Sequence, residues 1–140
     1  MNKFLFCYGT LMDGRSRNAI LRKLFFTYES TCYLSKHTVK HYERGNFPVA
    51  LESENAFEMV RGEIWKFPDV DESLQDCIMS MLDEIEGNGI LYTRKCFDFK
   101  GGKLYAYIGN KSVWEQENLI PALLDEDGFW VGGDTNAVQI

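Results

Sequence analysis

The 140-residue sequence lacks several features that would assign it to a class of protein at once. Lysine and arginine total 15 against 21 aspartates and glutamates, giving a formal net charge of −6. Binding to a phosphate backbone needs a basic surface, so we expect no nucleic-acid partner. No stretch approaches the roughly 20 apolar residues that span a bilayer, and the apolar run after Lys3 is too short for a signal peptide. We therefore expect no membrane partner and a cytoplasmic location.

Metal-ligand patterns are also missing. The four cysteines form no Cys-x-x-Cys pair, and we expect them to be buried thiols that act as small apolar residues: Cys7, Cys32, Cys77 and Cys96. His37 and His41 are four residues apart, but their segment has the pattern of a strand, which would separate them by roughly 13 Å. The sequence therefore predicts no metal site and implies no cofactor.

Length and composition indicate one folded domain over residues 1–140, with residues 110–140 as a variable C-terminal tail. Hydrophobic residues make up 45% of the chain and aromatic residues 14%. A chain of this length can bury a substantial core without disulfides, and the many aromatic residues favour strands.

Periodicity predicts more strands than helices. Residues 43–51 are expected to be a loop because Gly45, Asn46 and Pro48 break regular structure. Strands are expected over residues 3–8, within 25–42, over 59–67, 91–99 and 103–109, with a short one near 129–133. The segments 91–99 and 103–109 flank a Lys-Gly-Gly turn and should form a hairpin.

The clearest helix begins after an N-cap at Asp71 and ends at Gly87. Its apolar residues follow helical spacing and should form the buried face: Leu74, Cys77, Ile78, Met81, Leu82 and Ile85. A second helix is expected from Asp13 to about Leu24, and a less regular one over residues 113–124, which Pro121 interrupts. Together these elements predict an α+β fold with a curled or barrel-like sheet.

The segment FCYGTL, Phe6 to Leu11, places a glycine and a threonine directly after an apolar strand. Backbone N–H groups in such a turn can point the same way and bind an anion such as a carboxylate or phosphate. Gly9 has no Cβ, so a ligand can approach the main chain closely. The alternative is a tight turn that binds no ligand.

Five short motifs occur in a fixed order: YGTL (8–11), GNFP (45–48), VRGEIW (60–65), LDEIEG (82–87) and LYTR (91–94). This set resembles the gamma-glutamylcyclotransferase-like family over residues 3–108. The resemblance implies a small mixed β-barrel flanked by a few helices. It also implies an enzyme that acts on a small γ-glutamyl substrate, in which the α-amine attacks the γ-amide and releases 5-oxoproline and a free amine or amino acid.

Within this resemblance, Glu86 is the carboxylate that moves the proton, and Tyr8, Gly9, Thr10 and Leu11 form the loop that holds the glutamyl carboxylate. Helical spacing alone places Asp83 toward solvent and leaves Glu84 and Glu86 as equal candidates. One physical point agrees with Glu86: the last turn of a helix carries negative partial charge, which should raise the pKa of a carboxyl there.

Tyr92 and Arg94 alternate along a strand and share one face. Tyr92 is a candidate hydrogen-bond donor to the substrate. For Arg94 two roles are open, namely pairing with a substrate carboxylate or a structural ion pair with Glu63 or Glu86. The family often has a tyrosine where this chain has Gly109. That departure leaves open a binding protein without turnover, and an acyl transfer or amide cleavage on another amine-bearing group. The oligomeric state cannot be read from the sequence.

Overall fold

The computed structural model describes residues 2–131, which contain eight strands and three helices. The part of the predicted tail beyond residue 131 lies outside the described residues. The elements are, in chain order, β1 (Lys3–Cys7), α1 (Asn18–Lys23), β2 (Thr27–Ser35), β3 (His37–Tyr42), β4 (Phe47–Glu52), β5 (Met59–Lys66), α2 (Glu72–Glu86), β6 (Tyr92–Phe99), β7 (Gly102–Gly109), α3 (Lys111–Trp114) and β8 (Ile120–Pro121). No helix within residues 2–131 is long and apolar enough to cross a bilayer.

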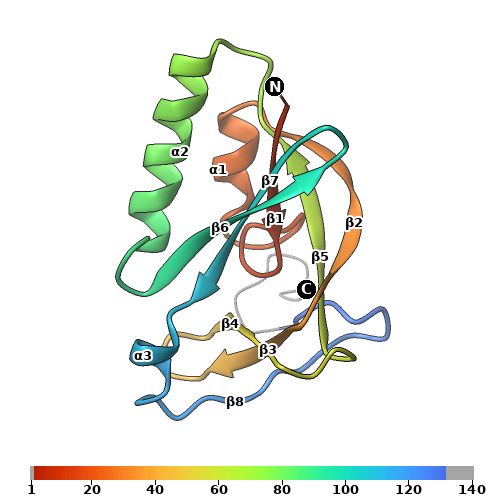
Figure 1. The fold of residues 1–140 in the computed structure, drawn as a ribbon, viewed down its shortest axis with the longest axis vertical. Helices are drawn as coiled ribbons and strands as arrows, with labels where there is room; N and C mark the ends of the chain where they lie inside the picture. Colours follow the sequence, from red (N-terminus) through yellow and green to blue (C-terminus); the bar gives the residue numbers. More distant parts are fainter. Residues whose placement is uncertain (1, 132–140) are drawn as a thin grey trace.

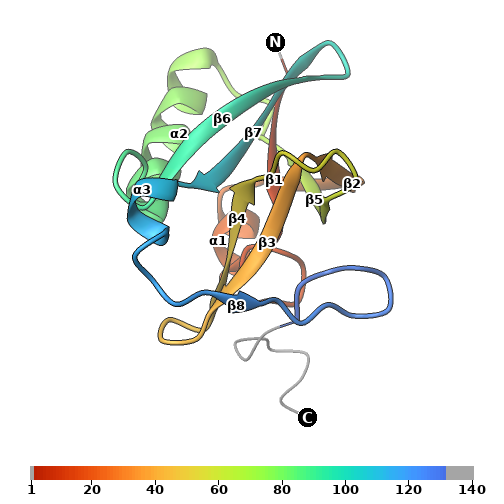
Figure 2. The same cartoon turned by 60° about the horizontal axis from the view of Figure 1, so that its bottom comes forward.

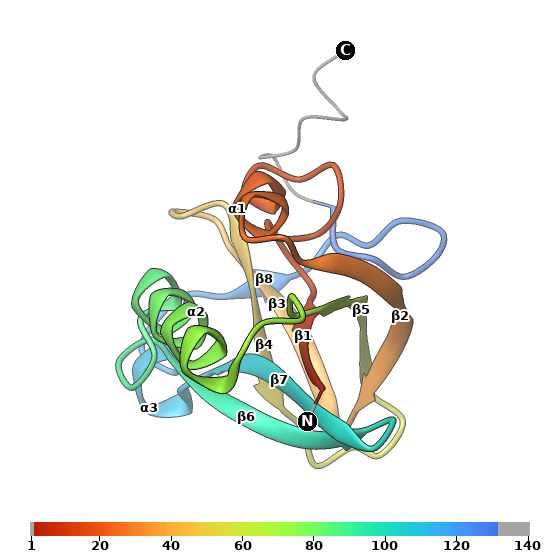
Figure 3. The ribbon, with the colours of Figure 1, turned by 90° about the horizontal axis from the view of Figure 1, so that it is seen from above.

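The strands form two sheets that curve toward each other. The larger has the order β2-β5-β1-β7-β6, and the smaller, which comes forward in Figure 2, has the order β4-β3-β8. The larger sheet is mixed, because β1 is antiparallel to β5 but parallel to β7. Helices α1 and α2 lie outside the strands (Figure 3), and the smaller sheet lies at the opposite end of the molecule from α2 (Figure 1). The predicted α+β, barrel-like fold is confirmed, although the two sheets do not close completely.

Strand β1 is buried on both faces, which explains its unbroken apolar run. Leu5 and Cys7 belong to one core cluster, which also contains residues of α1 and α2. Phe4 and Phe6 belong to the other, which the strands enclose between them. The central strand thus joins two cores, and its carboxyl end emerges between them.

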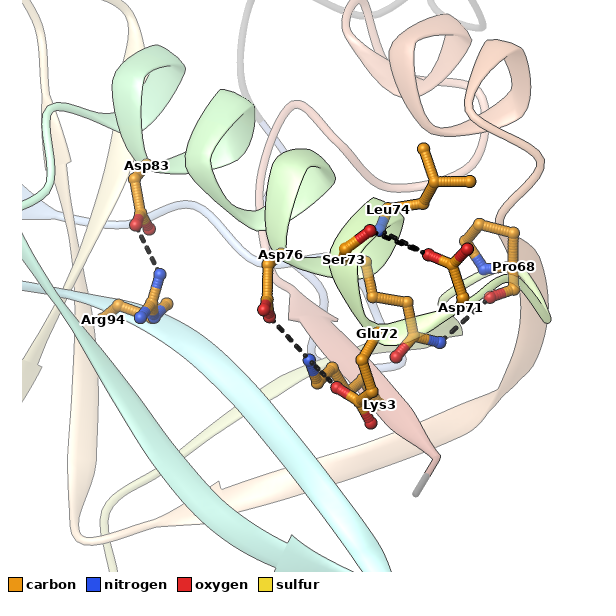
Figure 4. A network of polar contacts seen from close by, with 10 residues as sticks. Lys3, Pro68, Asp71, Glu72, Ser73, Leu74, Asp76, Asp83 and Arg94 are labelled. Carbon is orange, nitrogen blue, oxygen red and sulfur yellow. Dashed lines mark hydrogen bonds and ion pairs between the residues drawn. The ribbon is translucent and has the colours of Figure 1, made fainter.

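Helix α2 has the predicted ends. The Asp71 side chain accepts a hydrogen bond from the N–H of Leu74 at 2.9 Å, and Gly87 ends the helix in the left-handed conformation with φ 65°. Figure 4 shows this cap, together with Lys3 of β1 bound to acidic residues of the first turns. The helix is therefore fixed both by its own capping and by ion pairs to the central strand.

The predicted buried face of α2 is wrong in part. Leu82 is buried as expected, but its buried companions are Gln75 and Met79. Four residues expected inside are exposed: Leu74, Cys77, Met81 and Ile85. Gln75 can be buried because its side-chain amide donates to the carbonyl of Pro68 at 3.1 Å, which satisfies a polar group that the apolar pattern would exclude.

Several other predictions need correction. Residues 47–51, expected to be part of a loop, belong to β4, because an edge strand tolerates the missing N–H of Pro48. Helix α1 is shorter than predicted, since Asp13 does not cap it and residues 13–17 form turns and an isolated bridge. The helix predicted over 113–124 is only the one turn of α3, and residues 120–121 pair with β3 as β8.

The cysteines are free but not uniformly buried. Cys7 is buried, Cys32 is half-buried, and Cys77 and Cys96 are exposed. The predicted strand near 129–133 is represented, within the described residues, by one bridge between Leu124 and Trp130.

Candidate functional site

A cavity opens where β1 ends, beside the last turn of α2 and the start of β4. Six of the seven residues singled out from the sequence line it: Tyr8, Gly9, Thr10, Leu11, Glu86 and Tyr92. The remaining lining residues are Phe6, Cys7, Arg17, Phe47, Pro48 and Tyr107. Arg94 lies outside the lining. Segments that are far apart in the sequence therefore meet around one space.

The loop after β1 has its carbonyl groups engaged and its N–H groups available. The carbonyls of Gly9, Thr10 and Leu11 accept hydrogen bonds from later residues at 3.0, 2.8 and 2.7 Å. No acceptor within residues 2–131 receives a hydrogen bond from the N–H groups of the same three residues. Main-chain donors without a protein acceptor, at the edge of a cavity, are suited to bind an anion.

A glycine is needed at position 9 because another part of the protein packs closely against it, and not only to leave room for a ligand. A Cβ at this position would lie 2.7 Å from Cγ of Pro48 and 3.1 Å from its Cδ. The backbone of the loop therefore rests directly on the proline ring of β4, which fixes one wall of the cavity.

Glu63 fixes the other side of the same loop. It faces Cys7 across the β1–β5 ladder, and its Oε1 accepts hydrogen bonds from the N–H of Asp13 at 2.7 Å and from Nε1 of Trp65 at 3.0 Å. The Gly-Glu-x-Trp motif thus supports the loop and does not line the cavity.

The phenol of Tyr8 is occupied by the protein. Its OH donates to the carbonyl of Tyr107 at 2.7 Å and accepts from the N–H of Ala50 at 3.2 Å. Burial raises the pKa of this phenol well above its usual value. Tyr8 therefore shapes the cavity, and its hydrogen bonds link the residue after β1 to strands β4 and β7.

Glu86 is the last residue of α2, and its side chain is 12% exposed. Burial is the main cause that raises its pKa, and the charge of Arg17, whose Nη2 lies 3.6 Å from Oε1, opposes the shift. Glu84, which spacing left as an equal candidate, is exposed. Of the two, Glu86 is the carboxylate that lines the cavity.

Asp83 does not face solvent as spacing had suggested, because it is half-buried in a polar network with Tyr107 and Arg94. Its Oδ1 accepts from the OH of Tyr107 at 2.7 Å, and its Oδ2 pairs with Nη1 of Arg94. Figure 4 shows the Arg94 guanidinium reaching from the hairpin to the helix. Arg94 makes an ion pair, but its partner is neither Glu63 nor Glu86, the partners considered from the sequence.

Tyr92 is buried, and its OH lies 3.4 Å from the carbonyl of Pro48. Burial raises the pKa of this phenol, and the nearby Glu86 raises it further. The ring packs against Trp114 of α3, with centroids 6.1 Å apart. Tyr92 therefore stays a protonated donor at the cavity wall.

Gly109, the departure from the family pattern, lies away from the cavity. A Cβ there would meet Val49 at 2.6 Å, Trp114 at 2.9 Å and Leu51 at 3.0 Å. The space beside residue 109 is thus filled by the protein's own side chains, in particular the indole of α3.

Sequence reasoning missed Arg17 and Phe47 as lining residues. Phe47 belongs to the GNFP motif, which was a usable signal. No sequence signal pointed to Arg17, because its position depends on how the turns before α1 fold back onto the loop. There its Nε donates to Oγ1 of Thr10 at 2.8 Å. Within residues 2–131, no three His, Cys, Asp or Glu side chains gather as metal ligands would.

Comparisons with known proteins agree on the fold. The family model described as "Gamma-glutamyl cyclotransferase, AIG2-like" matches residues 5–132. No curated protein sequence matches the chain. Among solved structures, an AIG2-like protein from Mus musculus is 17% identical with a TM-score of 0.63, covering 94% of this chain and 96% of that one.

Two bacterial structures are similar to the same extent. Protein YtfP from Escherichia coli is 17% identical with a TM-score of 0.60, covering 89% of this chain and 98% of that one. The uropathogenic E. coli protein c4763 is 18% identical with a TM-score of 0.61, covering 93% of each chain. At such identities these structures support the fold, whereas the family model covers nearly the whole sequence. The chain belongs to the gamma-glutamyl cyclotransferase, AIG2-like family.

Proposed function

We propose that this protein is a γ-glutamyl cyclotransferase that converts a γ-glutamyl amide into 5-oxoproline and a free amine. The observation that carries the proposal is the position of Glu86: a largely buried carboxylate lines the same cavity as three main-chain N–H groups that have no acceptor among residues 2–131. One glutamyl group could touch both, with its α-carboxylate on the loop and its α-amine beside Glu86.

In the proposed reaction Glu86 takes a proton from the α-ammonium group of the substrate. The free amine attacks the γ-carbonyl carbon, and a new C–N bond closes the five-membered ring. Glu86 then gives the proton to the leaving nitrogen as the old amide bond breaks. It also passes the second proton of the new ring nitrogen to the departing amine, which leaves as an ammonium ion while Glu86 returns to its carboxylate form. Atoms and charges balance without a cofactor or water. The raised pKa of Glu86 suits a group that must both accept and return a proton near neutral pH.

Intramolecular attack explains why so little machinery is needed. Holding the two reacting groups in position supplies effective molarities of about 10⁵ M or more. Gly9, Thr10 and Leu11 are proposed to anchor the glutamyl α-carboxylate. Tyr92 is proposed to turn its one hydroxyl proton from the carbonyl of Pro48, a long hydrogen bond of 3.4 Å, to the substrate. Arg94 is proposed to keep Asp83, and with it the last turn of α2, in place.

The test is production of 5-oxoproline from a panel of γ-glutamyl compounds by the purified protein. Glu86→Gln should lower kcat by about 10²–10⁴-fold, the range for one general acid–base group. Glu84→Gln is the matched control, since it removes the same charge from an exposed position two residues away. Full activity in Glu86→Gln would refute the assigned base.

The alternative of a binding protein without turnover rested on Gly109. That residue does not line the cavity, so its replacement of a family tyrosine gives no reason to expect a lost substrate contact. Stabilisation of the protein by γ-glutamyl compounds, without any product from the wild type, would support this alternative.

A further inference from the structure

The cavity continues outward into a groove of about 320 Å³. The two spaces share Thr10, Arg17, Phe47, Glu86 and Tyr92. The groove adds residues of the β3–β4 turn, the last turn of α2 and the start of the hairpin. Because Glu86 lines both spaces, an amide nitrogen beside its carboxylate has the glutamyl group on one side and the groove on the other.

The charge in the groove comes from Arg17. Its Nε is fixed by Oγ1 of Thr10 at 2.8 Å, and its Nη2 lies 3.6 Å from Oε1 of Glu86, longer than a hydrogen bond. The side chain is 39% exposed and lines the groove. Arginine carries five N–H donors, and Thr10 and Glu86 account for only some of them.

The rest of the groove has an apolar wall and a polar side formed by Thr10 and Asn46. Phe47 packs from the start of β4, while Ile85 and Leu91 are 39% and 38% exposed. Glu86 and Arg17 are the charged side chains that line it. The groove therefore presents one cation next to Glu86, with an apolar wall on one side and Thr10 and Asn46 on another.

From this geometry, and resting on the proposed cyclotransferase reaction, we propose that the leaving group is an apolar α-amino acid and that Arg17 binds its carboxylate. That carboxylate is two bonds from the leaving nitrogen. A nitrogen within hydrogen-bond reach of Glu86 thus brings it to the guanidinium, which lies 3.6 Å from the same carboxylate oxygen. The apolar side chain then lies against Phe47, Ile85 and Leu91.

The proton transfer strengthens this preference. When Glu86 accepts the proton from the α-ammonium group, it becomes neutral and no longer balances Arg17. A carboxylate on the leaving group restores an opposite charge beside the guanidinium at that step. A leaving group with an ammonium group at the same place would be repelled by Arg17, because Glu86 is the one carboxylate among the described residues that line the groove.

The test compares three substrates by kcat/KM for 5-oxoproline: γ-glutamyl-leucine, γ-glutamyl-isopentylamine, which lacks only the carboxylate, and Nε-γ-glutamyl-lysine. We expect wild type to prefer the leucine compound over the isopentylamine compound on the order of tenfold, the effect of one charge-assisted contact. The lysine compound, whose charges lie far from the leaving nitrogen, should not share this advantage. In Arg17→Gln the leucine preference should fall to about twofold or less.

Arg44→Gln is the control, because it removes the same charge from an exposed position that does not line the groove. Equal rates for the leucine and isopentylamine compounds in wild type, or a preference that persists in Arg17→Gln, would overturn the role of Arg17 but not the cyclotransferase. No 5-oxoproline from any of the three would overturn both. Should Arg17→Gln fail to fold, the wild-type ratio and the methyl ester of γ-glutamyl-leucine still decide, because the ester removes the same charge from the substrate.

Discussion

Gly9→Ala tests whether the loop after β1 is held by its contact with β4. The new methyl group would lie 2.7 Å from Cγ and 3.1 Å from Cδ of Pro48, closer than non-bonded carbons approach. The proline ring is stiff, so the loop or β4 must move. Overpacking of this kind costs about 1–3 kcal/mol, which for a domain of this length lowers Tm by roughly 3–12 °C.

Activity should fall more than stability. The same displacement moves the N–H groups of Gly9 and its neighbours relative to Glu86, and a shift of about 1 Å can cost about 10²-fold in rate. Pro48→Ala removes both ring atoms that the methyl group would meet. A double-mutant cycle should therefore show a favourable coupling of about 1 kcal/mol or more between the two changes. The assays are thermal denaturation and 5-oxoproline formation.

The cycle also provides the control. Pro48→Ala alone alters the entropy of the unfolded chain by about 0.4–1 kcal/mol, and the cycle subtracts this effect. If Gly9→Ala melts and turns over like wild type, or if its penalty is unchanged when Pro48 is also alanine, the contact does not position the loop and our account of the cavity wall is wrong.

Three further predictions follow from the same geometry. Burial raises the pKa of Glu86 in the folded state above its value in the unfolded chain. Between these two pKa values the folded state binds a proton that the unfolded state has lost, so the free energy of unfolding falls as pH rises through that window. Glu86→Gln should therefore unfold at a higher temperature than wild type at pH 7 but not below pH 4. Arg94→Gln removes the ion pair to Asp83 and should cost about 1.5–3 kcal/mol in chemical denaturation; a fall in kcat with KM unchanged would support a positioning role, whereas a raised KM alone would indicate a substrate contact. Gly109→Ala should lose about 1–3 kcal/mol by denaturation, because its methyl group would meet Trp114 at 2.9 Å, and a variant as stable as wild type would contradict the packing described there.

Local sequence signals predicted where helices and strands lie more reliably than they predicted which of their residues are buried. The ends of α2 were predictable because Asp71 and Gly87 act within a few residues of themselves. Its buried face was not, since the apolar stripe through Met81 points to solvent and a polar residue, Gln75, is buried with its amide satisfied. Burial depends on which neighbours pack against a helix, and periodicity does not contain that information.

The site was predictable where a motif lies in one stretch of chain. Residues 8–11 and Glu86 were identified from short motifs, and the structure brings them to one cavity. The role of Arg17 in the lining and the ion-pair partner of Arg94 were not predicted, because each depends on contacts between elements that are separate in the sequence. The carboxylate that Arg94 meets, Asp83, had been assigned to solvent on helical spacing alone.

The parallel pairing of β1 with β7 has a consequence for how the protein is made. Lys3 pairs with Lys103, so β1 can meet this neighbour only after about 100 further residues have been made, some 5–20 s later at ordinary rates of translation. Until then the edge of β1 that pairs with β7 has no strand beside it. Contacts this distant also slow the folding of a released chain. Completion of the larger sheet, and with it the wall that Tyr92 and Tyr107 give to the cavity, therefore waits for the β6–β7 hairpin to dock on β1.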